Sequence, residues 1–183
     1  MSLITFEELE EFVEGRVLEG ARHENVNAAS IDVRLGYRFM VEKMERGGNP
    51  YVDVSQKEAP TMSEITIDPD KPMVLHPGQF VLAETMERFH LNNDIACEFK
   101  LKSSAARAGL NHSLAGWGDP GFNNATLTLE LQNVLRDHSL ILRPGMKIGQ
   151  IVFWRGHPVP DEHSYAVKGR YNGQKGPTAS KGV

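Results

Sequence analysis

The residues best suited to chemistry in this chain lie in the segment from Cys97 to Glu130. A Lys-Ser-Ser sequence at 102–104 is followed by Arg107, and a Gly-Asp-Pro-Gly turn places Asp119 ahead of Glu130. Cations and hydroxyls of this kind bind anions through strong hydrogen bonds, and a carboxylate can accept and return a proton. We therefore expect the chemistry of the protein to be concentrated in this segment.

Glu130 interrupts the run Ala125-Thr-Leu-Thr-Leu-Glu-Leu131, whose alternating β-formers predict a buried or half-buried strand. A buried carboxylate is costly unless it is paired, protonated or used as an acid or base. A second interpretation is equally compatible with the pattern. Thr126, Thr128 and Gln132 share the parity of Glu130, so all of them could lie on the solvated face of an edge strand.

The neighbouring candidates also have ordinary structural interpretations. Taken alone, Lys-Ser-Ser is typical of a solvated loop, and an arginine such as Arg107 most often forms a surface ion pair. Asp119 in Asp-Pro-Gly is typical of a turn. A functional interpretation therefore depends on the combination of these residues rather than on any one of them.

The composition limits the kind of fold that can position these side chains. The chain has 183 residues, 40% of them hydrophobic, which is enough for one well-packed domain over 1–183. With 17 glycines, 10 prolines and few long helical patterns, the sequence predicts a mainly β fold of the barrel or jelly-roll type. The net charge of -4 gives no long-range attraction to nucleic acid or to an anionic membrane.

The single cysteine, Cys97, excludes an internal disulfide and any multi-cysteine metal site. No stretch approaches the ~20 apolar residues that a membrane span needs, and the start of the chain lacks a signal-peptide pattern. We therefore expect a soluble, cytoplasmic protein without nucleic-acid or membrane partners.

Local patterns predict the elements at the start of the chain and its repeated hairpins. Thr5-Phe-Glu-Glu8 forms a capping-box pattern, which predicts a short N-terminal helix. Residues 30–39 alternate strictly and predict one half-buried strand. A Pro-Gly turn precedes a strand in both 74–83 and 142–153, which suits a barrel or jelly roll assembled from similar hairpins.

The sequence predicts no helix or strand in several other segments. The segments 47–50 and 55–63 predict loops. From Gly169 onward the composition has no apolar period, so about 169–183 is expected to be a mobile tail that cannot bury itself. Its cationic and polar side chains among glycines also suit a lid that closes over an anion.

Taken together, these segments resemble the deoxycytidine triphosphate (dCTP) deaminases, the metal-free branch of the trimeric deoxyuridine triphosphatase (dUTPase) fold. The resemblance implies a distorted β-barrel of the dUTPase-like type, a homotrimer with active sites at subunit interfaces, and a C-terminal lid. The matching pieces, in order along nearly the whole chain, are Ser30-Ile-Asp-Val-Arg-Leu-Gly36, Leu75-His-Pro-Gly78, Lys102-Ser-Ser-Ala-Ala-Arg107, Asp119-Pro-Gly121, Leu127-Thr-Leu-Glu-Leu131, Arg143-Pro-Gly-Met-Lys-Ile-Gly-Gln150 and Tyr171-Asn-Gly-Gln-Lys-Gly-Pro177.

The resemblance implies hydrolysis of dCTP to deoxyuridine triphosphate (dUTP) and ammonia, which supplies dUTP for deoxyuridine monophosphate (dUMP) and thymidine triphosphate (dTTP) synthesis. Glu130 matches the carboxylate that acts as general base and then general acid. Arg107 matches the residue that orients it, and Ser103 and the Ala115 carbonyl match the anchors of the catalytic water. Most cytosine deaminases use a zinc ion held by one His or Cys and two further Cys, a set that one cysteine cannot supply.

The remaining matches concern the nucleotide. Asp119 would accept the deoxyribose 3′-hydroxyl, and Phe122 would leave no room for a 2′-hydroxyl. A Mg²⁺ ion is expected to arrive with the triphosphate, with no ligand from a protein side chain. The resemblance assigns nucleotide binding to Lys102, Ser104, Asp119, Phe122, Thr128, Leu129, Tyr165, Arg170 and Gln174.

Two of the departures of the chain from the family pattern bear directly on its activity. Leu114 stands where a threonine involved in inhibition by dTTP is usual, so that inhibition stays open. Gly116-Trp117 replaces a His-Arg pair of monofunctional enzymes and resembles the bifunctional members, which continue to dUMP and pyrophosphate. We favour an enzyme that stops at dUTP, with the bifunctional enzyme as a near-equal alternative. A dUTP pyrophosphohydrolase, a regulatory protein without turnover, and a C5-modified cytosine substrate also stay open.

Overall fold

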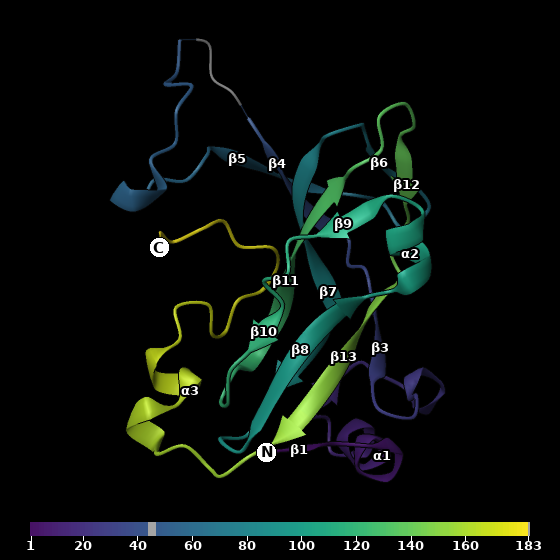
Figure 1. Cartoon of the computed structure of the whole chain (residues 1–183), viewed down its shortest axis with the longest axis vertical. Helices are drawn as coiled ribbons and strands as arrows, with labels where there is room; N and C mark the ends of the chain where they lie inside the picture. Colours follow the sequence, from purple (N-terminus) through teal and green to yellow (C-terminus); the bar gives the residue numbers. More distant parts are fainter. Residues whose placement is uncertain (44–46, 183) are drawn as a thin grey trace.

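The structure is a computed structural model that describes residues 1–43 and 47–182. Strands dominate these ranges, with short helical segments between them (Figure 1). The strands are β1 (Ser2–Leu3), β2 (Leu18–Glu19), β3 (Ile31–Arg34), β4 (Arg38–Glu42), β5 (Met62–Thr66), β6 (Met73–Leu75), β7 (Phe80–His90), β8 (Ile95–Leu101), β9 (Leu110–His112), β10 (Trp117–Gly118), β11 (Asn123–Asn133), β12 (Leu140–Leu142) and β13 (Lys147–Arg155). The α-helices are α1 (Phe6–Glu14), α2 (Ser103–Arg107) and α3 (Tyr165–Lys168), and the 3₁₀ turns are η1 (His23–Asn25), η2 (Val54–Gln56) and η3 (Asp161–His163).

Two antiparallel sheets and a two-stranded ribbon make up the body. The first sheet has the order β1-β13-β8-β10, with β3 also on β13; the second has the order β5-β4-β7-β11-β9, with β2 also on β7. The ribbon joins β12 to β6. One hydrophobic core includes the fully buried rings of Phe39, Phe89 and Phe153. The prediction of a mainly β fold is confirmed, in its jelly-roll form, because the described strands do not close into one barrel.

Helix α1 forms where the capping-box pattern predicts a helix, although the hydroxyl of Thr5 makes no capping hydrogen bond. The helix buries Leu9 and Phe12, and the Phe12 ring packs edge-on against Phe153 at 5.3 Å between ring centroids. It therefore anchors the start of the chain to β13. None of the described helices is long and apolar enough to cross a membrane.

The predicted single strand over 30–39 is wrong, because the chain breaks there into β3 and β4. Strand β3 pairs with β13 in one sheet, whereas β4 pairs with β5 and β7 in the other. Gly36 lies at the break, and a Cβ atom there would come within 2.4 Å of Cγ of Glu84. Strict alternation continues across the break and conceals the crossing from one sheet to the other.

Two arginine–carboxylate pairs fix this crossing. Arg34 donates from Nε to Oε1 of Glu87 at 2.7 Å and from its backbone amide to Oε2 at 2.8 Å. Arg38 donates from Nε and Nη2 to the two oxygens of Glu84, both at 2.9 Å. The side chain of Glu87 is fully buried, and burial raises its pKa while the hydrogen bonds from Arg34 oppose the rise. Both carboxylates lie on β7, so the pairs tie β7 to the crossing.

We predict that Arg34→Met lowers the free energy of unfolding by about 3 kcal/mol, because it leaves the buried Glu87 without its cation. Urea unfolding at a fixed protein concentration measures the change. Arg22→Met is the matched control, since Arg22 and Glu24 form a largely exposed pair that contributes little. Equal stability of the two variants would contradict the assignment of Arg34.

Candidate functional site

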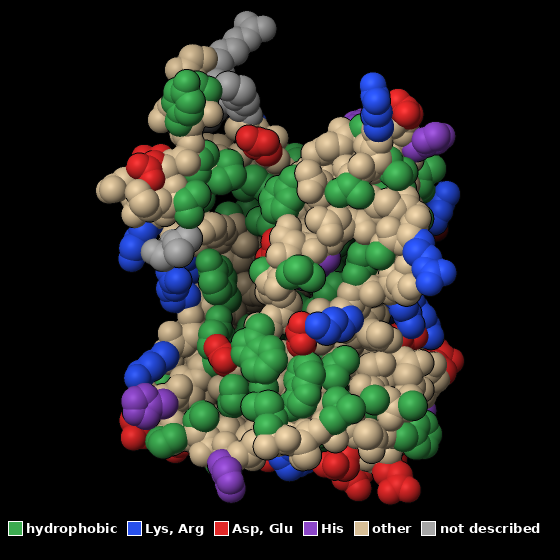
Figure 2. Space-filling model, viewed as in Figure 1, with side chains coloured by type: hydrophobic (Ala, Val, Ile, Leu, Met, Phe, Trp, Pro, Cys, Tyr) green, Lys and Arg blue, Asp and Glu red, His purple; other side chains and the backbone are tan. Residues whose placement is uncertain are grey.

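A cavity of about 490 Å³ lies between the middle of β11 and the C-terminal tail. Phe80 and Leu82 of β7 and the rings of Trp117 and Tyr171 give it mostly apolar walls. Figure 2 shows this face of the molecule, which is hollowed and bordered by hydrophobic side chains. The residues that were expected to serve one site and that line this cavity are Ala115, Phe122, Thr128, Glu130, Tyr165 and Gln174.

Glu130 lies on the wall of this cavity and not on an edge strand. Its strand, β11, is paired with β7 on one side and with the short β9 on the other. Its side chain is 24% exposed, which is intermediate between the two interpretations of the sequence. The carboxylate is therefore partly desolvated and still accessible from the cavity.

His112 is a neighbour of Glu130 that the sequence did not single out. Nε2 of His112 lies 3.2 Å from Oε2 of Glu130, and the His112 side chain is only 4% exposed. The imidazole packs against Phe99, with 4.7 Å between ring centroids. Within the described residues neither atom has a hydrogen bond of acceptable geometry, so this is a close contact without alignment. The sequence contains one signal for this neighbour: His112 lies two residues after Leu110, so both side chains lie on the buried face of β9.

A second cavity of about 450 Å³ adjoins the first and shares Tyr165 and Tyr171 with it. Asp119 and Arg170 line the second cavity, and His163 and Lys168 also do so. Burial raises the pKa of the Tyr165 hydroxyl, and the nearby Asp119 carboxylate adds to the rise. Charged and polar groups thus gather next to a mainly apolar cavity.

The C-terminal tail is packed on β11, whereas the sequence predicts that about 169–183 is mobile and cannot bury itself. Nε2 of Gln174 donates to the Thr126 carbonyl at 2.7 Å and to Oγ1 of Thr128 at 3.2 Å. The amides of Gly176 and Thr178 donate to the hydroxyls of Thr126 and Thr128. Gly176 is buried as a result. The tail lacks an apolar period, and hydrogen bonds to the threonines of β11 hold it instead. The opening of the tail as a lid stays a prediction.

The segment that contains Ser103, Ser104 and Arg107 lies outside both cavities. Ser103, Ser104 and Arg107 belong to α2, where they are exposed and line neither the first cavity nor the second. The side chain of Leu129 is fully buried in the core, so any contact of Leu129 with a nucleotide would involve its backbone. A single chain therefore does not bring Glu130 and the residues of α2 into one cavity.

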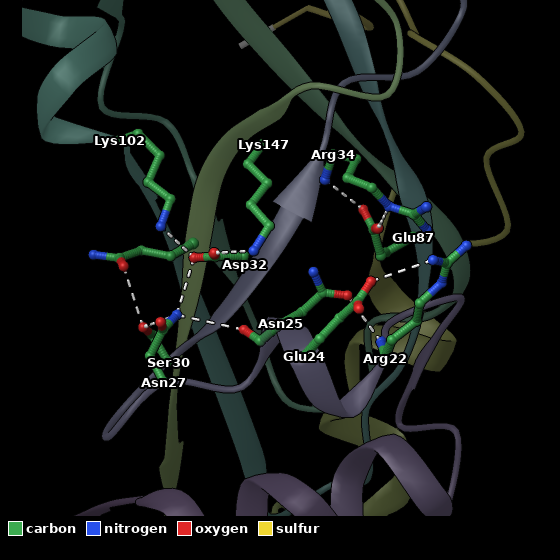
Figure 3. A network of polar contacts seen from close by, with 11 residues as sticks. Arg22, Glu24, Asn25, Asn27, Ser30, Asp32, Arg34, Glu87, Lys102 and Lys147 are labelled. Atoms are coloured by element: carbon green, nitrogen blue, oxygen red, sulfur yellow. Dashed lines mark hydrogen bonds and ion pairs between the residues drawn. The ribbon is translucent and has the colours of Figure 1, made fainter.

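Lys102 has a partner within the chain that the sequence did not suggest. Its Nζ donates to Oδ1 of Asp32 at 2.5 Å, and Lys147 Nζ lies 3.1 Å from Oδ2 (Figure 3). Asn27 Nδ2 donates to Oδ1 at 2.9 Å. Burial acts to raise the pKa of Asp32, but the hydrogen bonds from Lys102, Asn27 and Lys147 outweigh it and lower the pKa. Asp32 thus holds the ammonium group of Lys102 beside α2.

The donor set for a metal ion is sparse. In the described part of the chain no three His, Cys, Asp or Glu residues gather closely enough to hold a metal ion. The carboxylates that line the cavities, Asp119 and Glu130, lie in different ones. The described side chains around the two cavities thus do not form a metal cage within one chain. The expected absence of zinc stays a prediction.

Comparisons with known proteins agree with this fold and show the family of the chain. The family model for dCTP deaminase-like proteins matches residues 6–156, and the chain belongs to that family. A Kocuria rhizophila protein named "dCTP deaminase, dUMP-forming" is 42% identical over 172 residues, which cover 91% of this chain and 87% of the relative. A Streptomyces coelicolor protein with the same name is 44% identical over 160 residues, 85% of this chain and 81% of the relative.

A solved structure supports the same fold. The 2'-deoxycytidine 5'-triphosphate deaminase from Agrobacterium tumefaciens superposes with a TM-score of 0.63 at 20% sequence identity. The match covers 89% of this chain and 51% of that longer chain. At this identity the likeness shows the fold alone, which is the fold of that deaminase.

We predict that Asp32→Asn lowers the free energy of unfolding at pH 7 by about 2 kcal/mol, because a neutral amide replaces a charged acceptor. The folded-state pKa of Asp32 lies below its unfolded value, so its charge stabilises the fold above about pH 4. This contribution is lost as the pH falls through the folded-state pKa. The difference between Asp32→Asn and the unchanged protein should therefore stay constant down to about pH 5 and narrow in more acidic solution.

Asp68→Asn is the control for this pH series, because Asp68 and Lys71 form an exposed pair. Chemical unfolding between pH 3 and pH 7 gives both curves. A difference for Asp32→Asn that does not change with pH would show that the Asp32 charge is not the source of the stabilisation.

We predict that Gln174→Ala loosens the packing of the tail on β11, because it removes the two hydrogen bonds from Nε2 of Gln174. Hydrogen–deuterium exchange of the Gly176 and Thr178 amides should accelerate about tenfold. Lys175→Ala, at an exposed position of the same segment, should leave the exchange unchanged. Equal exchange in both variants would mean that other contacts hold the tail.

Proposed function

We propose that the protein deaminates dCTP and continues to dUMP and pyrophosphate. The observation that carries the deamination is the placement of Glu130 on the wall of a mostly apolar cavity of about 490 Å³. The second step is supported by the relatives, whose printed names include "dUMP-forming", and by the Gly116-Trp117 pair. The sequence alone favours an enzyme that stops at dUTP, and the names of the relatives favour the alternative.

Glu130 supplies the proton transfers of the first step. Its carboxylate takes a proton from a water molecule as the water oxygen attacks C4 of cytosine. The same proton then passes to the ring, a C4 carbonyl forms, and the amino group leaves as ammonia after it receives a second proton from the hydroxyl. The partly buried carboxylate faces the cavity, where the water and the base would lie.

The Ser103 and Arg107 roles require a second subunit in this proposal. Both residues are exposed on α2 of their own chain, outside its two cavities. In a homotrimer with sites at the interfaces, α2 of a neighbour would bring Ser103 to the catalytic water and Arg107 to Glu130. Closed symmetric assemblies form repeated interfaces of this kind.

The second cavity suits the sugar and the phosphates. Asp119 would accept the 3′-hydroxyl, while Arg170 and Lys168 provide positive charge for phosphate oxygens. Lys102 would reach the triphosphate from α2 with the donors that Asp32 leaves free, since an ammonium has three. Mg²⁺ carried by the triphosphate would neutralise charge near the α-phosphate, where a second water displaces pyrophosphate.

Inhibition by dTTP, which the sequence leaves open, concerns the segment around Leu114. Leu114, at the position where the family has threonine, is 92% exposed. Its backbone has φ 60, in the left-handed region that branched residues rarely adopt. The segment before Ala115 is therefore strained, which is compatible with a second conformation.

Incubation of the purified protein with dCTP and Mg²⁺, with separate assays of nucleotides, pyrophosphate and ammonia, tests the proposed function. We expect dUMP, pyrophosphate and ammonia. Accumulation of dUTP would mean that the protein only deaminates dCTP. Pyrophosphate from added dUTP without ammonia from dCTP would indicate a pyrophosphohydrolase, and dCTP binding without product would indicate a regulatory protein.

We predict that Glu130→Gln lowers the rate of ammonia release by about 10³-fold or more, because an amide cannot accept the proton of water. The dissociation constant for dCTP should stay close to that of the unchanged protein, since the cavity keeps its shape. Glu64→Gln, at an exposed position of β5, serves as the control. Ammonia release that survives in Glu130→Gln would refute the role of Glu130.

A further inference from the structure

A hydrogen bond joins the walls of the two cavities. The indole Nε1 of Trp117 donates to Oδ1 of Asp119 at 2.9 Å. Trp117 lines the first cavity and Asp119 lines the second, and the two cavities meet at Tyr165 and Tyr171. The bond therefore lies where the base and the sugar of one nucleotide would adjoin.

The backbone around Trp117 has little freedom to move. Strand β10 pairs with β8, and glycines flank Trp117 on both sides. A Cβ atom at Gly116 would lie 2.7 Å from Cβ of Phe99, and one at Gly118 would lie 2.6 Å from Sγ of Cys97. These close approaches hold β10 directly against the sheet.

The indole ring of Trp117 is also supported from its side. It packs against Trp154 of β13, with ring centroids 5.7 Å apart and planes inclined by 31°. A tryptophan side chain has few rotatable bonds, so this packing and the fixed backbone together set the direction of its N–H group. Trp117 is thus a rigid donor although it is about half exposed.

Asp119, in contrast, is an exposed residue in a turn. Among the residues that the structure describes, Trp117 is the one side-chain hydrogen-bond donor to its carboxylate. A free aspartate side chain would sample several rotamers, and ordering it costs entropy. With Oδ1 held by the indole, Oδ2 keeps its acceptor capacity for a ligand hydroxyl.

We propose that Trp117 is a positioning residue that orients Asp119 toward the sugar 3′-hydroxyl and thereby sets the preference for nucleotides that carry this group. The inference rests on the proposed function, in which Asp119 accepts that hydroxyl. A tryptophan that only formed the wall of the base cavity would affect nucleotides with and without a 3′-hydroxyl alike. Discrimination between two such nucleotides therefore separates the two roles.

The test compares kcat/KM for ammonia release from dCTP and from 2′,3′-dideoxycytidine triphosphate. In Trp117→Phe, which keeps an aromatic ring but lacks the donor, the preference for dCTP should fall by about tenfold, the size of one hydrogen bond to a charged group. The loss should appear in kcat/KM for dCTP, with kcat/KM for the dideoxy nucleotide nearly unchanged. Trp154→Phe alters the packing partner without removing a donor to Asp119 and should keep the preference.

Equal changes for both nucleotides in Trp117→Phe would overturn the inference. If Asp119→Asn keeps the same preference for dCTP over the dideoxy nucleotide, Asp119 does not bind the 3′-hydroxyl and the inference is wrong. Ammonia release from dCTP by the unchanged protein would still support the proposed function in that case. If the unchanged protein released no ammonia, the proposed function would fail, and calorimetric dissociation constants for the same two nucleotides would still test the inference. Benzothienylalanine at position 117, with sulfur in place of the N–H, repeats the test if Trp117→Phe does not fold.

Discussion

The alternation of side chains along β11 is the constraint on which both the core and the site depend. One parity of the strand, including Leu129 and Leu131, is buried in the hydrophobic core. The other parity presents Thr128 and Glu130 to the cavity. Because a register shift of one residue would exchange the two faces, the burial of the leucines fixes the direction of the Glu130 carboxylate. Core packing and the direction of the Glu130 side chain are thus two consequences of one pairing.

The same strand also organises the tail. The hydroxyls of Thr126 and Thr128 accept hydrogen bonds from the tail amides of Gly176 and Thr178. Tail packing thereby supplies the wall of the cavity that the sheets leave open, through Tyr171 and Gln174. A tail held by a few hydrogen bonds can separate at low cost, as the proposed lid would have to do for a nucleotide to enter.

Local patterns in the sequence predict those parts of the structure that depend on local forces. The strand around Glu130 follows from alternation, and α1 follows from its capping-box pattern and apolar residues, although the Thr5 hydroxyl makes no capping hydrogen bond. Other features join residues far apart in the sequence. The approach of His112 to Glu130 depends on the pairing of β9 with β11, and the contact of Lys102 with Asp32 depends on the neighbouring positions of β3 and β8 on β13. The break at Gly36 is invisible for the same reason, since Glu84 enforces it from another strand.

The arrangement of the two cavities bears on how one site would carry out two reactions. In the proposed function, deamination would take place at the base and release of pyrophosphate at the α-phosphate, several bonds away across the sugar. The cavities share Tyr165 and Tyr171, so one nucleotide could occupy both without leaving between the steps. The apolar cavity with Glu130 suits the uncharged base, whereas the adjoining one with Arg170 and Lys168 suits the anionic end. The difference in charge between the two cavities would then orient the nucleotide, and a single bound orientation would serve both reactive atoms.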